Sequence, residues 1–167
     1  MRTTALFVTG VGIFVGGMIA GTAVPALTAQ RTNPGFRLNH VQITVPNLEE
    51  ALAFYTKVMG FRVAYELPNR DGRAATVFVQ INRDTFLEVA SAEAGAMPGI
   101  THIGLWTDDA DAAVAQIRGA GAAVGDVRPT NSTGSRLATL IDRHGIRLEI
   151  NEQPPESWMR KAMDSWR

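Results

Sequence analysis

The spacing of apolar residues changes repeatedly along the chain. From about residue 36 onward, stretches in which every second residue is apolar alternate with stretches that carry apolar residues at helical spacing. The first set predicts a strand, a helix and three strands, at 37–45, 48–59, 61–66, 75–82 and 84–91. The second set predicts the same order, at 100–107, 109–119, 122–127, 136–142 and 146–152. The order βαβββ therefore occurs twice, which predicts an α+β domain over 36–152 with two similar modules, 36–91 and 100–152.

The beginning of the chain has a different character. No residue between Arg2 and Arg31 is charged, and residues 5–24 are apolar apart from threonine and glycine. A positive residue, an apolar run and then small residues form the pattern of a signal peptide, here residues 1–29. Because the run approaches the roughly 20 residues of a membrane span, an uncleaved membrane anchor through residues 5–24 is the alternative. Both alternatives predict an exported domain, either periplasmic or secreted.

Composition narrows the possible partners and chemistries. The 167 residues include 16 Lys plus Arg and 16 Asp plus Glu, so the chain has no excess of positive charge with which to bind nucleic acid. The sequence contains no cysteine, which excludes a zinc–thiolate site and a cysteine nucleophile. A metal ion in this protein must therefore be bound by histidine and carboxylate side chains.

Histidine and glutamate recur at one repeat distance. His40 and His102 each lie at the beginning of a predicted strand and are 62 positions apart. Glu88 and Glu149 each lie near the end of a predicted module and are 61 positions apart. Two residue types that recur at almost the same period indicate equivalent positions in a repeated structure.

Strand alternation predicts where these four side chains point. Val41 and Ile43 lie on the strand face opposite His40, and the other three residues alternate with apolar neighbours in the same way. If a helix covers each apolar face and the sheets curve around the other face, two imidazoles and two carboxylates converge in one cleft. Such a group is costly to bury unless a cation neutralises it, so we predict that His40, Glu88, His102 and Glu149 bind a divalent metal.

The same inward face carries further side chains that could line a substrate cavity. These are Gln42, Thr44, Phe78, Gln80, Trp106, Arg147 and Asn151. Packing in the protein interior is the alternative role of Phe78 and Trp106.

The repeated modules and the His, Glu, His, Glu order resemble the vicinal oxygen chelate superfamily over about residues 36–152. This resemblance implies two βαβββ modules whose curved mixed sheets surround a metal or ligand cleft. The ligand order is most similar to that of bacterial glyoxalase I. Extradiol dioxygenases and fosfomycin-modifying enzymes usually lack the ligand that Glu88 would supply, and methylmalonyl-CoA epimerases carry glutamine there. This chain has Thr44 where glyoxalase I has an arginine that binds glutathione, which weakens the expectation of glutathione as a substrate.

The four predicted ligands indicate a metal-dependent reaction on a small molecule that chelates the ion. Histidine and carboxylate ligands suit Ni²⁺, Co²⁺, Mn²⁺, Fe²⁺ or Zn²⁺. The ion would stabilise the enediolate or oxyanion that forms when a proton is removed next to a carbonyl, as in a glyoxalase-type lyase or isomerase. Glu149 or Glu88 would be the catalytic base. The alternatives are an Fe²⁺ extradiol-type dioxygenase that uses His40, His102 and Glu149, and a metal-free module that binds small molecules.

The end of the chain, residues 153–167, predicts an amphipathic helix. Its apolar residues recur at helical spacing: Trp158, Met159, Ala162, Met163 and Trp166. A helix of this length is unstable alone in water, so it must pack against its own domain, cover the cleft or contact a second subunit. The superfamily resemblance implies a homodimer.

Overall fold

The computed structural model describes residues 33–70, 72, 74–93, 95 and 97–167. The predicted signal peptide at 1–29 and the alternative anchor at 5–24 lie outside these residues. Among the helices of the described part, none is long and apolar enough to cross a membrane.

In the described residues, eight strands form one mixed sheet in the order β2-β3-β4-β1-β5-β8-β7-β6. The strands are β1 (Arg37–Val45), β2 (Arg62–Pro68), β3 (Ala74–Asn82), β4 (Thr85–Ser91), β5 (Gly99–Trp106), β6 (Arg128–Pro129), β7 (Arg136–Ile141) and β8 (Arg147–Glu152). The helices are α1 (Leu48–Ala53), which continues as the π-helical turn η1 (Phe54–Val58), α2 (Ala110–Gly119) and α3 (Trp158–Asp164). The first strand of each module pairs in parallel with the last strand of the same module, and β1 and β5 join the two modules as antiparallel neighbours. The predicted α+β fold with two βαβββ modules is confirmed.

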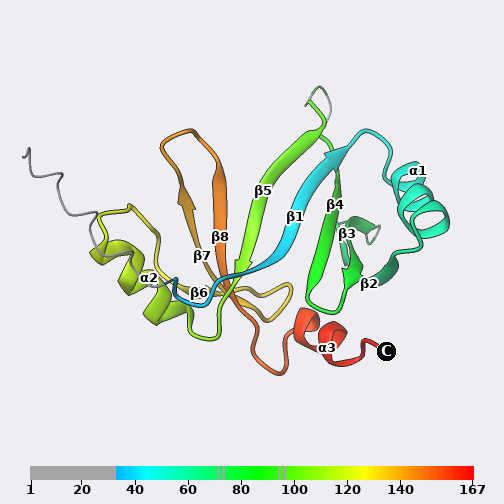
Figure 1. Cartoon of the computed structure of the whole chain (residues 1–167). Helices are drawn as coiled ribbons and strands as arrows, with labels where there is room; N and C mark the ends of the chain where they lie inside the picture. The colour runs from blue at the N-terminus through cyan, green and yellow to red at the C-terminus, as the bar shows by residue number, and fades with distance from the viewer. Residues whose placement is uncertain (1–32, 71, 73, 94, 96) are drawn as a thin grey trace, which may run out of the picture. The chain divides into compact units, whose positions relative to one another are not determined.

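The two helices α1 and α2 cover one face of their own modules, as Figure 1 shows. Both begin at a polar cap: the side chain of Asn47 accepts a hydrogen bond from the amide of Glu50, and that of Asp109 accepts one from Ala112. The valine-rich face of the first module, with Val77, Val79 and Val89 fully buried, packs under α1 and η1. The residues that alternate with these valines therefore point to the opposite face of the sheet.

The predicted strand at 122–127 is wrong. In this stretch Val124 forms only an isolated bridge with Leu140, and the paired strand β6 is the short segment Arg128–Pro129. Ala122, Ala123 and Gly125 offer little side-chain surface for strand packing, so the apolar run is too weak to form an extended ladder.

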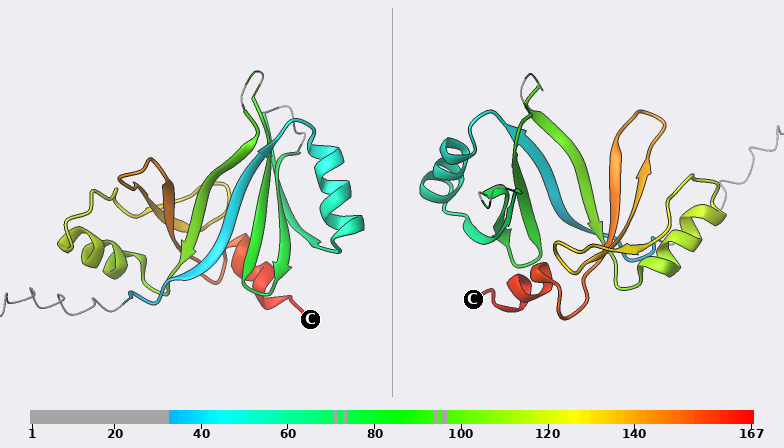
Figure 2. Two further views of the ribbon diagram at one scale, coloured as in Figure 1. Left: turned by 45° about the horizontal axis from the view of Figure 1, so that its top comes forward. Right: turned by 180° about the vertical axis from the view of Figure 1, so that it is seen from behind.

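The C-terminal helix α3 packs against its own domain. Met159, Ala162 and Met163 are buried in a cluster with Phe78, Phe86 and Trp106, and Tyr65 packs at its edge. Figure 2 shows this helix next to the strands of the first module, although it follows β8 of the second module in sequence. The helix therefore connects the two modules at one end of the sheet.

Candidate metal centre

Four neighbouring strands each supply one side chain to a buried cluster. His40 lies on β1, Glu88 on β4, His102 on β5 and Glu149 on β8, and these strands are adjacent in the order β4-β1-β5-β8. All four residues are at least nine-tenths buried. The structure therefore brings together the four residues that sequence alternation placed on one face.

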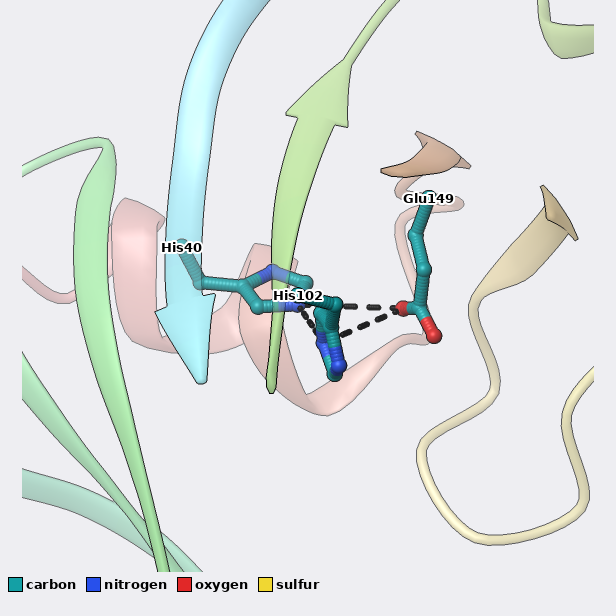
Figure 3. Close-up of side chains that lie close together, drawn as sticks. All are labelled: His40, His102 and Glu149. Carbon is teal, nitrogen blue, oxygen red and sulfur yellow. Dashed lines mark hydrogen bonds and ion pairs between the residues drawn. The ribbon is translucent and has the colours of Figure 1, made fainter. Parts of the chain in front are cut away.

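The ligand-type atoms of the cluster lie close to one another. The two Nε2 atoms of His40 and His102 are 3.0 Å apart. Glu88 Oε2 lies 3.4 Å from each of these nitrogens, and Glu149 Oε2 lies 3.7 Å from His40 Nε2 and 3.6 Å from His102 Nε2. Figure 3 shows both imidazoles and the Glu149 carboxylate directed toward the same point.

These distances fit a single metal ion. Two ligands bound at about 2.1 Å to one ion lie about 3.0 Å apart at a right angle and about 3.4 Å apart at a tetrahedral angle. The separations of 3.0 to 3.4 Å between the imidazoles and from them to Glu88 fall in this range, and the 3.6 and 3.7 Å to Glu149 correspond to angles of about 120–125°. Imidazole nitrogen and carboxylate oxygen are also donors that divalent transition metals accept. His40, His102 and Glu149, whose ligand atoms all lie within 4.8 Å of one another, therefore fit a divalent ion, and Glu88 Oε2 lies next to both imidazoles as a candidate fourth donor.

A glycine makes room for one of the imidazoles. Gly104 on β5 pairs with His40 on β1, and a Cβ built on Gly104 would overlap the His40 ring. Even His40 Nε2, which points toward the cluster, would lie only 2.6 Å from that Cβ. Because no side chain larger than hydrogen fits at this position, Gly104 is required for the observed placement of His40.

A second layer of hydrogen bonds orients the ligands. His40 Nδ1 lies 3.0 Å from Asn39 Oδ1, and the Asn39 amide nitrogen donates to the carbonyl of Asp84 at 3.4 Å. This orientation makes Oδ1 the acceptor and His40 Nδ1 the donor, so His40 Nε2 keeps a free lone pair for a metal.

Each carboxylate directs one oxygen at the cluster while another residue holds its second oxygen. Gln42 Nε2 donates to Glu88 Oε1 at 2.6 Å, and Arg147 Nη2 donates to Glu149 Oε1 at 2.8 Å. The Gln42 amide is in turn oriented by the hydroxyl of Thr101, which donates to its oxygen. Each carboxylate therefore leaves Oε2 directed at the two imidazoles, where it would be available to a metal ion.

Burial and neighbouring groups set the charge state of the cluster. Burial lowers the pKa of His40 from 6.5 to about 4, and this effect outweighs the opposing attraction of Glu88. Burial by itself would raise the pKa of Glu88, but hydrogen bonding from His102 and attraction by the two imidazoles hold that pKa below its usual range. A neutral imidazole and an ionised carboxylate are the forms that bind metal.

The cluster forms part of the wall of a cavity of about 220 Å³. Four of the seven side chains predicted to line a substrate cavity reach it: Gln42, Phe78, Arg147 and Asn151. The remaining three, Thr44, Gln80 and Trp106, lie outside the cavity lining. Thr44 hydrogen-bonds the carbonyl of Gly99.

Helix α3 separates Gln80 and Trp106 from the cavity. The Gln80 amide is fully buried and donates to the carbonyl of Ala162 in this helix at 3.3 Å. Trp106 packs with the α3 methionines and carries the guanidinium of Arg37 on its ring at 3.7 Å. Both side chains do point to the face that alternation predicts, but the helix covers that part of the face.

Comparison with known proteins identifies the family. A family model of the "Glyoxalase/Bleomycin resistance protein/Dioxygenase superfamily" matches residues 37–150, which is well over half of the chain. The chain belongs to this superfamily. The predicted resemblance to the vicinal oxygen chelate superfamily is therefore confirmed.

Several relatives within the superfamily are similar to this chain. Human mitochondrial methylmalonyl-CoA epimerase is 34% identical over 93 residues, which are 49% of this chain and 52% of that protein. The chain thus spans about half the length of the human and mouse relatives that it matches. Among solved structures, a variant of Streptomyces coelicolor methylmalonyl-CoA epimerase in complex with 2-nitronate-propionyl-CoA has a TM-score of 0.61 and 25% identity, and the match covers 72% of this chain and 96% of that one. The epimerase from Mycobacterium tuberculosis, at 22% identity and a TM-score of 0.60 over 71% of this chain and 88% of that one, shows the fold alone.

The cavity wall also contains residues that the sequence pattern did not predict. Tyr65 and Gln153 line the cavity, as does Met159 of α3. A group of hydroxyl side chains between β6 and β7 also lines it: Thr130, Ser132, Thr133 and Ser135. For Gln153 a signal was available, because it continues the alternation of Glu149 and Asn151 beyond the predicted strand. The hydroxyl group has no comparable signal, since a run of Ser and Thr in a loop is common.

Proposed function

We propose that this chain is a metal-dependent isomerase that removes a proton from the carbon next to a carbonyl group of a small acyl substrate. The observation that carries this proposal is a buried pair of imidazoles, 3.0 Å apart, with a carboxylate oxygen of Glu88 and one of Glu149 each 3.4 to 3.7 Å from both imidazoles, in the wall of a cavity. A divalent ion held by these residues would supply Lewis acidity, which stabilises negative charge on a substrate oxygen.

The two glutamates are suited to move the proton. Glu88 and Glu149 come from β4 and β8, the strands on either side of the two histidine strands. Because Gln42 and Arg147 hold the Oε1 atoms, each glutamate directs Oε2 at the cluster. An epimerase takes a proton from one face of a carbon and returns one to the other face, so carboxylates on two sides suit this reaction. We assign the base to Glu149 or Glu88.

Methylmalonyl-CoA is the first substrate to test. The relatives described above carry the name methylmalonyl-CoA epimerase, and one solved relative at 26% identity, with a TM-score of 0.61, contains methylmalonyl-CoA. A cavity of about 220 Å³ is smaller than the sites that enclose a drug-sized ligand, so it would hold the reacting acyl group and leave the rest of the CoA outside. A glyoxalase-type reaction is the second candidate, because Glu88 gives this chain the ligand order of bacterial glyoxalase I.

Hydrogen exchange distinguishes these activities from inert binding. Protein loaded in turn with Co²⁺, Ni²⁺, Mn²⁺ or Zn²⁺ is incubated in D₂O with one C2 epimer of methylmalonyl-CoA, and deuterium at C2 is measured by mass spectrometry. The proposal expects metal-dependent exchange together with conversion to the other epimer. Exchange that is as fast in chelator-treated protein, or absent with every metal, contradicts it. The hemithioacetal of methylglyoxal and glutathione is assayed in parallel for the glyoxalase-type reaction.

An Fe²⁺ dioxygenase is a further candidate because His40, His102 and Glu149 alone form a group whose ligand atoms lie within 4.8 Å of one another. In that enzyme Glu88 would be dispensable for metal binding. Glu88 Oε2 nevertheless lies as close to both imidazoles as Glu149 Oε2 does, so the metal content of Glu88→Gln protein decides between three and four ligands. Oxygen uptake by Fe²⁺-loaded protein with a catechol separates a dioxygenase from an isomerase. Protein that is purified without metal and still binds the substrate with undiminished affinity would favour a metal-free module that binds small molecules.

We also propose that the domain is exported and forms a homodimer. The uncharged stretch between Arg2 and Arg31 supports export, and superfamily membership supports the dimer. Fractionation of cells that produce the full chain tests the first proposal, and full-length protein found only in the cytosol would contradict it. Light scattering of the purified protein tests the second. Export would direct the substrate search toward acids without CoA, since CoA thioesters are intracellular compounds.

A further inference from the structure

Helix α1 is covered less completely than its counterpart α2 in the second module. The two helices begin 62 positions apart, which is the repeat distance of the two histidine ligands. Helix α2 contains three buried residues, Ala110, Ala113 and Val114. Helix α1 contains none, and the equivalent residues are only partly buried: Leu48, Ala51 and Leu52. One side of α1 therefore lacks a neighbour that α2 has.

The segment that precedes β1 supplies the cover of α2. Phe36 packs against the apolar cluster that contains Ala113 and Val114. Pro34 lies two residues before Phe36, and its carbonyl accepts a hydrogen bond from Thr107 Oγ1 at 3.0 Å. A short stretch of chain with one large apolar side chain thus closes this side of the second module.

The equivalent place in the first module is an open groove of about 430 Å³. Its lining residues come from the end of β1, from α1 and from η1: Val45, Pro46, Asn47, Glu50, Ala51, Phe54 and Tyr55. Val45 and Ala51 stand 62 positions before Thr107 and Ala113, so the groove corresponds to the place that the Phe36 segment fills in the second module. Phe54 in its wall is 49% exposed.

By the same repeat, the cover of this groove is expected from the residues just before β5. Strand β5 begins at Gly99, which pairs with Thr44 near the end of β1, so this segment lies at the same end of the sheet as the groove (Figure 1). Met97 in this segment is 89% exposed, more than any other large apolar side chain in the described part of the chain. Met97 therefore does not fill the groove of its own chain and is available to another.

We infer that Met97 of a second copy of the chain fills this groove in a two-fold symmetric dimer. In such a dimer both copies use the same surface, so each copy must present a groove and also the side chain that fills its partner's groove. This end of the first module presents both. The contact removes the exposed apolar surface of Met97 and Phe54 from water, which favours association. The inference rests on the proposed homodimer and identifies its surface.

Sedimentation velocity of protein purified from cells that produce the full chain measures this association. Met97→Asp should raise the dissociation constant of the dimer by about 100-fold or more, because a carboxylate would enter an apolar groove twice in each dimer and each entry costs at least about tenfold. Ile141→Asp is the matched control, since Ile141 is also a highly exposed apolar residue but lies on β7 of the second module. Thermal midpoints show whether the variants are folded.

Cross-linking locates the contact, because the chain contains no cysteine of its own. Cells produce a Met97→Cys chain together with a Glu50→Cys chain, a short bismaleimide is added to the purified protein, and mass spectrometry identifies the linked peptides. A link between positions 97 and 50 then joins two different chains. Ala112→Cys replaces Glu50→Cys in the control, since Ala112 is the exposed residue of α2 at the equivalent position.

The results separate this inference from the other proposals. A link between positions 97 and 50, together with a weakened Met97→Asp dimer, supports it. Monomeric wild-type protein overturns the homodimer and the inference together. A dimer that Met97→Asp does not weaken, or a link between 97 and 50 that forms only when both cysteines are on one chain, overturns the inference alone. None of these measurements depends on turnover, so the proposed reaction can fail while this surface stands.

Discussion

Replacement of Gly104 by alanine should remove His40 from the metal centre. The added Cβ would lie 2.6 Å from His40 Nε2 and nearer still to other ring atoms. Carbon and nitrogen in ordinary contact are about 3.5 Å apart, so the imidazole must retreat by about 1 Å or rotate away. Metal–ligand bonds tolerate deviations of only about 0.2 Å, so this displacement removes one of the four ligands.

We expect Gly104→Ala to lower metal affinity by at least about 100-fold, because losing an outer hydrogen-bond partner of a ligand already costs about 10- to 100-fold. The assay is competition for Co²⁺ or Zn²⁺ against a chromogenic chelator, with circular dichroism as the measure of folding. Gly119→Ala is the control, since Gly119 ends helix α2 and a Cβ there meets nothing within 4 Å. Folded Gly104→Ala protein that binds metal with wild-type affinity would refute the reasoning.

Three further predictions concern the ligands and their protonation. Glu88→Gln and Glu149→Gln should each lower turnover by about 10²- to 10⁴-fold, while the amide oxygen still permits weakened metal binding. Deuterium exchange at fixed times measures the turnover, and metal analysis of the same samples measures the binding. Full turnover in either variant excludes that residue as the base. Asn39→Ala should weaken metal binding about 10- to 100-fold by releasing His40 Nδ1, which the same chelator competition measures; an unchanged affinity would mean that this hydrogen bond does not orient the ring. In metal-free protein, His40 has a pKa of about 4 against 6.5 when unfolded, so only the unfolded state takes up this proton between these values. Stability should therefore fall by up to about 3 kcal/mol as the pH drops from 6.5 to 4, and urea midpoints that do not change over this range would contradict the prediction. The lowered pKa of Glu88 acts in the same direction, but only as the pH falls below about 4.5.

The fold and the convergence of His40, Glu88, His102 and Glu149 could be predicted because each depends on a local or repeated pattern. Alternation places His40 and Glu88 on the face that α1 does not cover, and the repeat places His102 and Glu149 in the same positions of the second module. Parallel pairing of the first and last strand in each module then makes these residues neighbours. Periodicity therefore carries most of the information about this part of the site.

The rest of the cavity depends on segments that periodicity does not describe. Gln80 and Trp106 have the orientation that alternation predicts, yet α3 covers them, and the sequence does not say where a C-terminal helix will pack. Tyr65 lies on the strand predicted at 61–66, but its place in the cavity wall depends on how β2 pairs with β3, which the alternation of β2 alone does not determine. Gly104 reads as an ordinary strand glycine until its position opposite His40 is known.

The division of the ligands between the modules has a consequence for folding. Each module contributes one histidine and one glutamate, and the two pairs meet across the β1–β5 seam. Neither module by itself contains more than half of the donors, so an ion bound by all four must hold the two modules together. The free energy of metal binding is then also free energy of association between the two halves of one chain. A chelator should weaken this seam first, before it affects the packing of either helix on its own module.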